Sequence, residues 1–387
     1  MGPLAGFRII EMAGIGPAPF AATLLSDMGA EVIRIDRREV ADLGLPGREP
    51  KFDVLHRGRR SLALDLKTEA GCAVVKRLAA KADGLIEGFR PGVMERLGLG
   101  PEELSKINPR LVVGRMTGFG QDGPMAQNAG HDINYIALAG VLHAIGRKGE
   151  GPVPPLNLVG DFGGGGMFLA FGVVCALLEA QKSGKGQVVD AAMVDGAAYL
   201  AAGIYGLYSQ GTWADERGVN VIDSGAPWYD VYKTKDGKWL SVGAIEKRFY
   251  AELVEKLGVG DAELPKQHDR KGWPELRRRF TEAIAGKTRA EWEAIFAESD
   301  ACVAPVLSLG EVEAHPHNKA RATFRRRDGV LQPGPAPRYS RTQCEMGAPA
   351  RGRGADSEAV LGDWGYAPAE IAGLKEAGVV GATAVEA

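Results

Sequence analysis

Residues 7–36 of the chain read FRIIEMAGIGPAPFAATLLSDMGAEVIRID. A β-rich run at residues 7–12 is followed by a turn and by helical periodicity at residues 20–28, which stops at Gly29. A second β-rich run follows at residues 31–35. A strand, a helix and a strand at this spacing predict a βαβ unit, in which the two strands are parallel.

This first unit is similar in outline to a dinucleotide-binding fold, with Asp36 where an acidic residue would bind a ribose. The turn after the first strand lacks the GxGxxG pattern, however. Pro17 and Pro19 occupy the zone where a pyrophosphate-binding loop needs glycines and N–H donors. We therefore expect neither a nicotinamide nor a flavin site here.

The alternation of strands and helices continues along the chain. Further β-rich runs lie at residues 61–66, 84–89, 111–117 and 187–193, and helical patterns separate them. Alternation of this kind predicts an α/β fold, in which a large Rossmann-like domain has a parallel sheet covered by helices on both faces.

The character of the sequence changes at about residue 227. Two β-rich runs flank Asp236-Gly237, which is a strong hairpin signal, and helical patterns follow. We therefore expect a second, smaller α+β domain. The expected division is residues 1–190 as the first part of the large domain, 191–226 as a linker helix, 227–320 as the small domain, and 321–387 as a C-terminal return to the large domain.

The composition is ordinary for a globular protein. The 387 residues carry a formal net charge of −2, which gives no bulk attraction for nucleic acid or for an anionic membrane. The longest apolar stretch, residues 167–178, is predicted to be too short to span a bilayer, and no secretory signal is visible. We therefore expect a cytoplasmic protein with neither nucleic acid nor a membrane as a partner.

The four cysteines are Cys72, Cys175, Cys302 and Cys344. They are far apart and form no CxxC pair, so neither a metal site nor a disulfide framework is expected. Three of them lie in apolar segments, which predicts buried thiols in a reducing compartment.

Basic residues follow the ends of the predicted strands. They are Arg37, Arg38, Lys67, Arg90 and Arg96. Ligands of doubly wound sheets bind beyond the carboxyl ends of the strands. Each residue alone is typical of a solvated charge, but together they favour a phosphate-bearing ligand. A further basic cluster, residues 57–60, is predicted to lie on a loop.

Residues 130–135 read GHDINY and open an apolar helical pattern after a turn-rich run. His131 and Asp132 are therefore predicted at a helix N-terminus, with Asp132 as the N-cap. Free backbone N–H groups gather there and favour negative charge. His131 is then either a proton shuttle beside an anion site or a loop histidine next to an ordinary cap.

Asp161 precedes four glycines, residues 163–166, and an apolar helix that is predicted to start at residue 167. Glycines at a helix N-terminus let the backbone approach a ligand closely. Asp161, at the mouth of this predicted turn, is either a second acid/base residue or a turn former.

Four segments resemble the family III CoA-transferases and, within that family, the α-methylacyl-CoA racemases. They are residues 87–92 (EGFRPG), 130–135 (GHDINY), 157–166 (NLVGDFGGGG) and 184–190 (GKGQVVD). The resemblance runs nearly end to end. Transferases of the family have the aspartate that corresponds to Asp161 but generally lack the histidine before Asp132. His131 therefore separates a racemase from a transferase.

The resemblance implies the family fold, an interlocked homodimer and an acyl-CoA substrate. It implies that His131 and Asp161 are the two acid/base residues, and that Glu246 supports the histidine across the dimer interface. No metal and no cofactor is implied, because CoA is part of the substrate. The CoA contacts carry over to Arg37, Leu64, Asp65, Leu66, Lys67, Gly88, Phe89, Arg90, Arg96, Gly130, Ile133, Asn134 and Tyr135.

The expected activity is that of an isomerase of fatty acid metabolism. Racemising a 2-methylacyl-CoA thioester removes the α-proton on one face and returns a proton on the other, through an enolate. His131 and Asp161 would each serve one face. The backbone N–H of Asp132 is a candidate donor to the enolate oxygen. Met167 and Met193 either line the acyl pocket or belong to the core.

Two other functions remain open at this stage. One is a CoA-transferase in which Asp161 is the nucleophile, and the other is a non-catalytic acyl-CoA-binding protein. The chain also departs from the family pattern at residues 40–51, where an insertion would alter the entrance for CoA, and in a longer C-terminal part.

Overall fold

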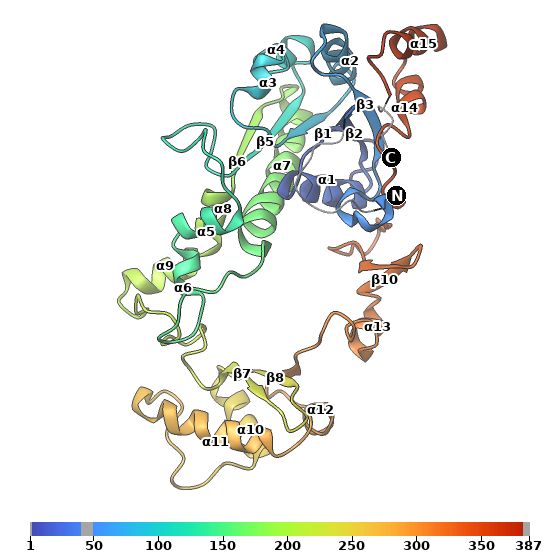
Figure 1. The fold of residues 1–387 in the computed structure, drawn as a ribbon. Coiled ribbons are helices and arrows are strands. Elements are labelled where there is room, and N and C mark those ends of the chain that lie inside the picture. The colour runs from blue at the N-terminus through green and yellow to red at the C-terminus, as the bar shows by residue number, and fades with distance from the viewer. Residues whose placement is uncertain (1, 40–48, 382–387) are drawn as a thin grey trace. The chain divides into compact units, whose positions relative to one another are not determined.

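The computed structural model describes residues 2–39 and 49–381. The chain divides into two compact units (Figure 1). The first unit comprises residues 1–139, 156–200 and 322–387, and the second comprises residues 140–155 and 201–321. Residues 140–155, which we expected in the large domain, thus belong to the second unit, and the expected linker at 191–226 is shared between the two units. Most of the 40–51 stretch, residues 40–48, lies outside the described residues.

The first unit contains a six-stranded parallel sheet in the order β3-β2-β1-β4-β5-β6. The strands are β1 (Arg8–Met12), β2 (Glu31–Arg37), β3 (Arg60–Leu64), β4 (Gly84–Glu87), β5 (Val112–Thr117) and β6 (Val188–Ala192). All six β-rich runs predicted for this sheet are therefore confirmed. The strand order is that of a doubly wound Rossmann fold, so the predicted fold class is confirmed as well.

Neighbouring residues of β1 belong to two different cores, one on each face of the sheet. Ile9 packs with α1 (Pro17–Asp27) and α7 (Phe168–Ser183). Ile10 points to the other face and packs in the core that includes α2 (Glu69–Ala79). Successive side chains of a strand point to opposite faces, so a run of consecutive apolar residues is what a doubly covered strand requires.

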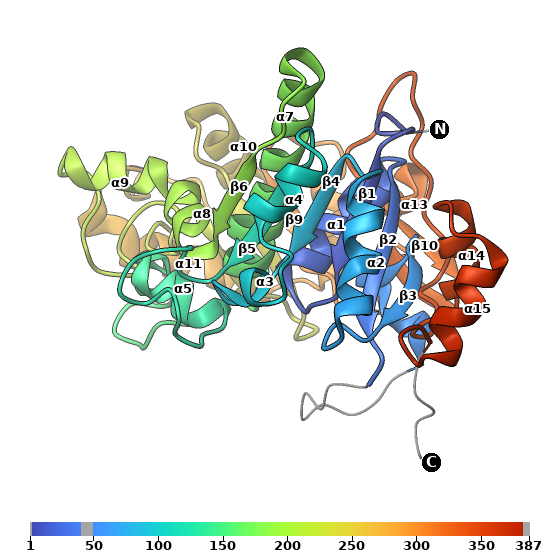
Figure 2. The ribbon, with the colours of Figure 1, turned by 90° about the horizontal axis from the view of Figure 1, so that it is seen from above.

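Short helices complete the first unit. They are α3 (Val93–Arg96), α4 (Pro101–Ile107), α5 (Asp132–Leu138), α8 (Met193–Leu200), α14 (Ser357–Asp363) and α15 (Pro368–Glu376), with 3-10 turns at Pro50–Phe52 (η1) and Val54–His56 (η2). Figure 2 shows α14 and α15 beside β3, at the edge of the sheet. Trp364, at the end of α14, is fully buried in the core on that face. The C-terminal segment is therefore part of the first unit and completes its hydrophobic core.

The glycine-rich segment is helical and is not a turn. Leu158–Met167 forms a π-helix (η3) that continues into α7, so the predicted helix start at residue 167 is wrong. The continuous helix Leu158–Ser183 has 26 residues with a mean hydropathy of 1.7 in its most apolar part, enough to cross a membrane by length and composition. The expectation that this apolar stretch is too short to do so is therefore wrong. Its buried Leu169 and Val173 pack in the core against the sheet, as in a core helix of a globular domain.

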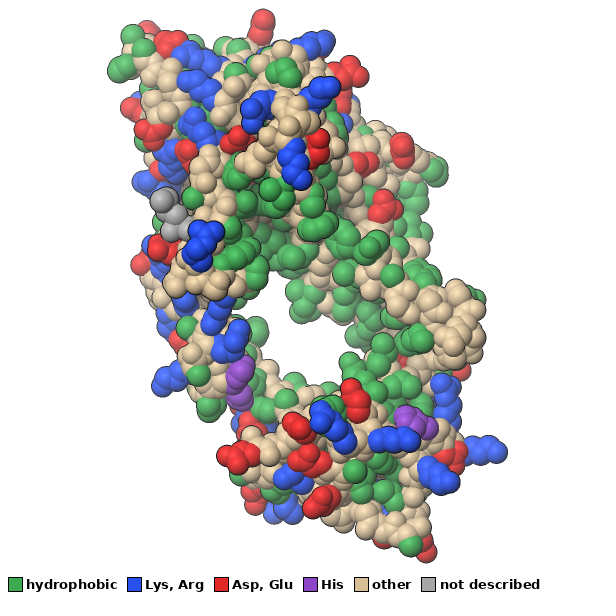
Figure 3. All heavy atoms as spheres, turned by 180° about the vertical axis from the view of Figure 1, so that it is seen from behind, with side chains coloured by type: hydrophobic (Ala, Val, Ile, Leu, Met, Phe, Trp, Pro, Cys, Tyr) green, Lys and Arg blue, Asp and Glu red, His purple; other side chains and the backbone are tan. Residues whose placement is uncertain are grey.

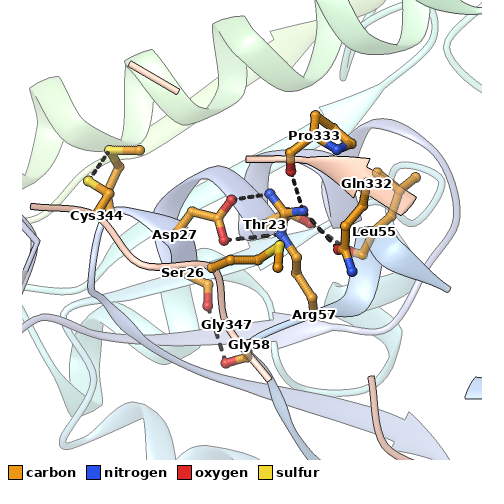
Figure 4. Close-up of polar contacts among 12 residues, drawn as sticks. Thr23, Ser26, Asp27, Leu55, Arg57, Gly58, Gln332, Pro333, Cys344 and Gly347 are labelled. Atoms are coloured by element: carbon orange, nitrogen blue, oxygen red, sulfur yellow. Dashed lines mark hydrogen bonds and ion pairs between the residues drawn. The ribbon is translucent and has the colours of Figure 1, made fainter. Parts of the chain in front are cut away.

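The basic cluster at residues 57–60 forms structural ion pairs. Arg57 is buried and bonds the carboxylate of Asp27 at the end of α1 (Figure 4). Its other amino group donates to the side chain of Gln332 at 3.0 Å and to the carbonyl of Pro333 at 2.8 Å. These two residues belong to β11 (Val330–Pro333), which pairs with β10 (Phe324–Arg327) in an antiparallel hairpin. Arg57 thereby fastens the C-terminal segment to the first βαβ unit.

Arg59 makes the second buried ion pair of this cluster. Its side chain and that of Glu11 are both fully buried, with 2.9 Å between Nε and Oε2. Asp36, once a candidate ribose ligand, bonds Arg34 at 2.8 Å and the hydroxyl of Ser61. The charges of this region are thus paired with one another inside the fold.

The second unit contains the antiparallel sheet β7 (Tyr229–Lys233), β8 (Trp239–Gly243) and β9 (Val303–Pro305). The predicted hairpin is confirmed, with Gly237 at a φ of 77° in its turn. One face of the sheet is covered by apolar residues of α10 (Lys247–Leu257), α11 (Trp273–Ala285) and α12 (Arg289–Phe296). The remaining elements are α6 (Val141–Ala144), α9 (Ala202–Ser209), α13 (Pro316–Arg321) and η4 (Arg270–Gly272).

The prediction for the cysteines is wrong for most of them. Cys72 is buried in α2, but Cys175 and Cys302 are exposed and Cys344 is half-buried. Cys175 lies on a face of α7 that the first unit leaves open, although its neighbours in sequence are apolar. An apolar segment alone does not show which of its faces is covered.

Candidate active site

The site lies where the chain changes direction across the sheet. β1 and β4 are neighbours, but β1 connects to β2 on one side and β4 connects to β5 on the other. In doubly wound folds, this switch point opens a crevice at the carboxyl ends of the strands. Gly88, directly after β4, faces the start of α1 so closely that a Cβ there would be 3.3 Å from the Cβ of Ala18.

Asp161 is held at this switch point by three different segments. It lies in the first turn of η3, and its backbone N–H donates a 2.7 Å hydrogen bond to Oδ2 of Asp132 in α5. Asn157, four residues earlier in the chain, donates from Nδ2 to Oδ2 of Asp161 at 3.1 Å. On the β1 side, a Cβ added to Gly16 would be 3.2 Å from the same carboxylate oxygen. The carboxylate therefore projects into the space between β1, α5 and η3.

The surroundings of Asp161 raise the pKa of its carboxyl group. Burial is the largest cause, because it penalises the charged form, and the negative charge of Asp132 raises the pKa further. The hydrogen bond from Asn157 and the charge of His131 lower the pKa in opposition. A carboxylate with a raised pKa is a stronger base, which suits proton abstraction from carbon.

His131 stands at the start of α5, which begins with Asp132. His131 is the N-cap, so the prediction that Asp132 is the cap is wrong by one residue. The backbone N–H of His131 donates to Oδ1 of Asn134 at 3.0 Å, and its carbonyl accepts from the N–H of Asn134 at 2.8 Å. This backbone arrangement leaves the exposed imidazole of His131 outside the helix. His131 lies near enough to Asp161 for its charge to lower the pKa of that carboxyl group, and Asp132, which follows His131 in sequence, accepts the backbone N–H of Asp161.

Asp132 is buried, and it links the two candidate bases. One oxygen of its carboxylate accepts from Asp161, while Oδ1 has no hydrogen-bond partner within the described residues. Gly160 makes this contact possible, because a Cβ at Gly160 would be 2.6 Å from Oδ2 of Asp132. The backbone N–H of Asp132 belongs to the first turn of the helix, where N–H groups have no partner within the helix.

Tyr135 contacts the residues that precede His131 in the chain. Its ring packs edge-on against Phe119 at a centroid distance of 4.9 Å, and its hydroxyl donates to the carbonyl of Gly130. A Cβ at Gly118 would overlap the ring of Tyr135. Burial, together with the charges of Asp161 and Asp132, raises the pKa of Tyr135 to about 12, so the phenol stays neutral.

The four glycines of η3 allow close packing of helices. A Cβ at Gly164 would be 2.5 Å from the backbone N of Ala197 in α8, and one at Gly166 would be 2.6 Å from the ring of Phe20 in α1. Gly163 faces the side chain of Leu200. The prediction that these glycines admit a ligand to the backbone is wrong for this packed part of the helix. Instead, they let η3 carry Asp161 close to α1 and α5.

The cationic residues expected to bind CoA lie at the same edge of the sheet. Arg37 is the last residue of β2, Lys67 follows β3 by three residues, and Arg90 follows β4 by three residues. These three and Arg96 in α3 are exposed. Parallel strands end at one edge, so the predicted position of these charges at the carboxyl ends is confirmed. Arg90 lies near enough to Tyr135 to oppose the rise in its pKa.

The other expected CoA contacts differ in exposure. Leu64 is buried, whereas Asp65, Leu66 and Phe89 are half-buried. Gly88, Gly130, Ile133 and Asn134 reach the surface, with Gly130 half-buried. The backbone N–H of Asp65 is taken by the carbonyl of Val379 at 2.9 Å. The C-terminal segment therefore lies directly beside this part of the expected site.

The turn after β4 is held by a buried charge network that the sequence did not suggest. Glu87 accepts from the backbone N–H of Phe89 at 2.6 Å and from Nε of Arg115 at 2.8 Å. Arg115 also bonds Glu95 in α3 at 2.8 Å. Burial raises the pKa of Glu87, although Arg115 and the N–H of Phe89 oppose it. This network fixes the backbone on either side of Gly88.

Glu246 belongs to the second unit, where it is exposed as the N-cap of α10. It therefore lies in a different unit from His131 and Asp161. Met193 is buried in the core beside Gly165, as expected for a core residue, whereas Met167 is exposed. Within residues 2–39 and 49–381, no group of three or more His, Cys, Asp and Glu residues could hold a metal ion.

Two residues of the site were missed by sequence reasoning. Asn157 lies four residues before Asp161, a spacing that places side chains on one face of a helix, but the glycines that follow predict a turn and so conceal this signal. Gly16 lies in the turn after β1, where the sequence indicates only that a GxGxxG motif is absent. Its φ of 71° and its approach to Asp161 give it a role in shaping the site.

Known proteins are similar to this chain in sequence and in structure. Residues 4–357 match the model of the CoA-transferase family III. The chain is 48% identical over 373 residues to the α-methylacyl-CoA racemase of Mus musculus, covering 95% of each chain. It is 44% identical over 389 residues to the α-methylacyl-CoA racemase of Homo sapiens, covering 99% of each chain. A crystal structure of a CAIB/BAIF family protein from Brucella suis superimposes with a TM-score of 0.79 and 25% identity, covering 94% of this chain and 99% of that one. The chain therefore belongs to the family III CoA-transferases.

Proposed function

We propose that this protein is an isomerase that interconverts (R)- and (S)-2-methylacyl-CoA thioesters. The observation that carries the proposal is the meeting of His131 and Asp161 on either side of Asp132. The mouse and human relatives, which are 48% and 44% identical, are α-methylacyl-CoA racemases. A transferase needs the carboxylate alone, so the histidine is the feature that favours the racemase. The same proposal assigns the protein to fatty acid metabolism in the cytoplasm.

The CoA part of the substrate would bind along the carboxyl ends of β2, β3 and β4. Arg37, Lys67, Arg90 and Arg96 supply positive charge there, as a ligand with several phosphates requires. The turn after β4 offers the backbone of Gly88 and Phe89, which the Glu87 network holds in place. The thioester would then lie over the start of α5, next to His131.

The proposed reaction uses one base on each face of the α-carbon. In one direction Asp161 removes the α-proton, the C–H electron pair moves into an enolate, and the imidazolium of His131 delivers a proton to the opposite face. In the other direction the roles are exchanged. The raised pKa of Asp161 makes its carboxylate a stronger base, as the removal of a proton from carbon requires. The N–H of Asp132 would donate to the enolate oxygen.

Glu246 is proposed to act on His131 across the interface of a homodimer. Glu246 lies in the other unit of the chain, and the interlocked dimer of the family would bring a second copy of it to His131. Large apolar side chains are exposed on the helices, and Figure 3 shows broad apolar areas on the surface. The exposed large apolar side chains include Phe171 and Leu178 of α7 and Tyr199 and Leu200 of α8. Exposed apolar areas of this kind are typical of a surface that another chain covers.

The decisive experiment is incubation of the purified protein with (S)-2-methylacyl-CoA esters in D2O. We expect epimerisation together with α-deuteration, and we expect His131→Ala and Asp161→Ala to abolish both. His143→Ala is the matched control, because His143 is an exposed histidine of the second unit and should retain activity. Deuterium exchange that survives His131→Ala would overturn the two-base assignment.

The same protein and acyl-CoA esters distinguish a transferase from a racemase. A transferase would acylate Asp161, and hydroxylamine added after an acyl-CoA would trap that residue. Trapping without α-deuteration would favour the transferase, and CoA binding with neither result would favour a binding protein. For the dimer, His131→Ala and Glu246→Ala chains are mixed. If Glu246 acts across the interface, the mixed dimer regains one intact site and part of the activity that each variant lacks.

A further inference from the structure

The last residues that the structure describes, 378–381, lie against the open edge of the parallel sheet, and we call them the terminal bridge. β3 is the outermost strand on this side, and the terminal bridge pairs with it in the antiparallel direction. The N–H of Asp65 donates to the carbonyl of Val379 at 2.9 Å. The N–H of Gly381 donates to the carbonyl of Ala63 at 3.1 Å. These bonds satisfy backbone groups that an edge strand otherwise leaves open.

The end of α15 directs the chain into the terminal bridge. Gly378 has a φ of 69°, and its N–H donates to the carbonyl of Lys375 at 2.9 Å. The N–H of Val379 donates to the carbonyl of Leu374, also at 2.9 Å. This is the Schellman arrangement, in which a glycine ends a helix. Val379 and Val380 are then buried in the core, each only 4% exposed. The position of the terminal bridge is therefore set by the fold itself.

The terminal bridge also holds the side chain of Arg38, which directly follows β2. Nε of Arg38 donates to the carbonyl of Gly381 at 2.9 Å. Nη1 lies beside Gly378, 3.5 Å from the position that a Cβ would take there. Arg38 is accordingly half-buried, whereas its neighbour Arg37 is exposed. Ordering a long side chain costs conformational entropy, so a cation that is already held loses less freedom when it binds a ligand.

The end of β3 is ordered by the same contacts. The backbone N–H of Lys67 donates to Oδ1 of Asp65 at 3.0 Å, and Asp65 is itself bonded to Val379. The ammonium group of Lys67 lies 3.7 Å from the carboxylate of Glu39, and the two side chains are 84% and 73% exposed. An ion pair this exposed contributes little, so the positive charge of Lys67 remains available to a ligand. The terminal bridge thus holds residues that follow both β2 and β3.

We propose that the terminal bridge is a positioning segment for the substrate, which holds Arg38 where its guanidinium meets a phosphate group of CoA. This inference rests on the proposed binding of CoA thioesters at the carboxyl ends of the strands, and it adds Arg38 and residues 378–381 to that site. The planar guanidinium of an arginine can present two N–H groups to one phosphate. Within the described chain, the terminal bridge bonds neither His131 nor Asp161. It therefore acts on the binding of the phosphates and not on proton transfer.

The first test compares two thioesters of the same 2-methylacyl group, one of CoA and one of pantetheine, which has no phosphate. Arg38→Ala should raise KM for the CoA ester about tenfold or more, the usual effect of losing a hydrogen bond between charged groups. The kcat for α-deuteration and the KM for the pantetheine ester should stay the same. Arg110→Ala is the matched control, because this exposed arginine precedes β5 at the opposite edge of the sheet.

Two shortened chains test the terminal bridge itself. A chain that ends at Ala377 lacks the bridge and should bind CoA about tenfold more weakly or worse in isothermal titration. A chain that ends at Ala382 keeps the bridge, with the carbonyl of Gly381 still in a peptide bond, and should bind as the full chain does. Because the bridge acts through Arg38, Arg38→Ala should lose most of its effect in the chain that ends at Ala377. Independent, multiplying losses would overturn the positioning role.

The two readouts separate this inference from the proposed reaction. Titration with CoA needs no turnover, so weaker binding by Arg38→Ala in a protein without α-deuteration would refute the racemase and support the terminal bridge. Unchanged CoA affinity in Arg38→Ala, with normal α-deuteration, would refute the terminal bridge alone. Equal losses for the CoA and pantetheine esters would also refute it, because they would indicate a general distortion. Thermal melting identifies variants that are folded, and Arg38→Ala leaves the bridge in place, so its result is decisive even where a shortened chain unfolds.

Discussion

The backbone N–H of Asp161 donates a 2.7 Å hydrogen bond to the buried carboxylate of Asp132. Asp132 is adjacent in sequence to His131 and accepts a hydrogen bond from Asp161, so one residue connects the two proposed bases. It also places a second negative charge beside Asp161. The pH dependence of the reaction should therefore respond to Asp132.

The first prediction concerns the pKa of Asp161. Asp132→Asn removes a charge that raises this pKa but keeps an oxygen that can accept the bond from Asp161. The pKa should fall, so the limb of the kcat/KM profile on which Asp161 must be ionised moves to lower pH. Asn157→Ala removes a hydrogen bond that lowers the pKa, so the same limb should move to higher pH. Shifts of the two variants in the same direction would contradict this assignment.

Gly16 provides the second prediction. Gly16→Ala would place a methyl group 3.2 Å from Oδ2 of Asp161, and α-deuterium exchange should fall by at least tenfold. Gly6→Ala is the control, because Gly6 also has a positive φ, 96°, but has no atom within 4 Å of an added Cβ. Both variants should lose about 1–3 kcal/mol of stability from backbone strain. An equal loss of exchange in both would mean that strain, and not the approach to Asp161, is responsible.

The third prediction tests the glycine packing of η3. Gly196→Ala in α8 would push a methyl group into the carbonyl of Gly164, which should cost about 1–3 kcal/mol or more and lower the melting temperature. Gly203→Ala in α9 meets no atom within 4 Å and should raise stability by about 0.4–1 kcal/mol. Calorimetric melting of the two variants measures the difference. A tolerated Gly196→Ala would show that the two helices can separate without loss.

The fourth prediction concerns the attachment of the C-terminal segment. Asp27→Asn leaves the buried Arg57 without its counter-ion, and breaking a buried pair typically costs about 3–5 kcal/mol. Limited digestion with trypsin should then cut sooner in the arginine-rich residues 321–353. The control is Glu103→Gln, which breaks an exposed ion pair with Lys106 and should leave the digestion unchanged. Identical digestion patterns would show that other contacts hold the segment.

The strands of the first unit could be predicted because each is a short β-rich run between turn residues. Their order could not, since the neighbours of β1 are β2 and β4, and nothing local to Ile9 or Ile10 specifies them. That both faces of the sheet are covered could be predicted, however, because strands and helices alternate along the chain.

The prediction of a turn at the glycine-rich segment failed for a physical reason. Four consecutive glycines favour a turn when only local conformational freedom is considered. In the folded chain, Gly164 packs against Gly196, which lies far along the sequence. Two helices can approach this closely only where neither has a side chain, so the contact stabilises the helical conformation of the glycines. The proximity of His131 and Asp161 came from the family resemblance, because spacing along the chain does not bring α5 and η3 together.

The first unit begins with residues near the N-terminus and is completed only by residues near the other end. Trp364 is fully buried, and the carbonyl of Val379 accepts the N–H of Asp65 beside β3. During synthesis, β1 to β6 leave the ribosome long before α14 and α15, so the face of β3 stays uncovered while the second unit is made. The nascent chain must therefore keep Leu62 and Leu64 from aggregating until its last helices arrive. Stop codons shortly before Trp364 should yield insoluble protein, even though every proposed catalytic residue would already be present.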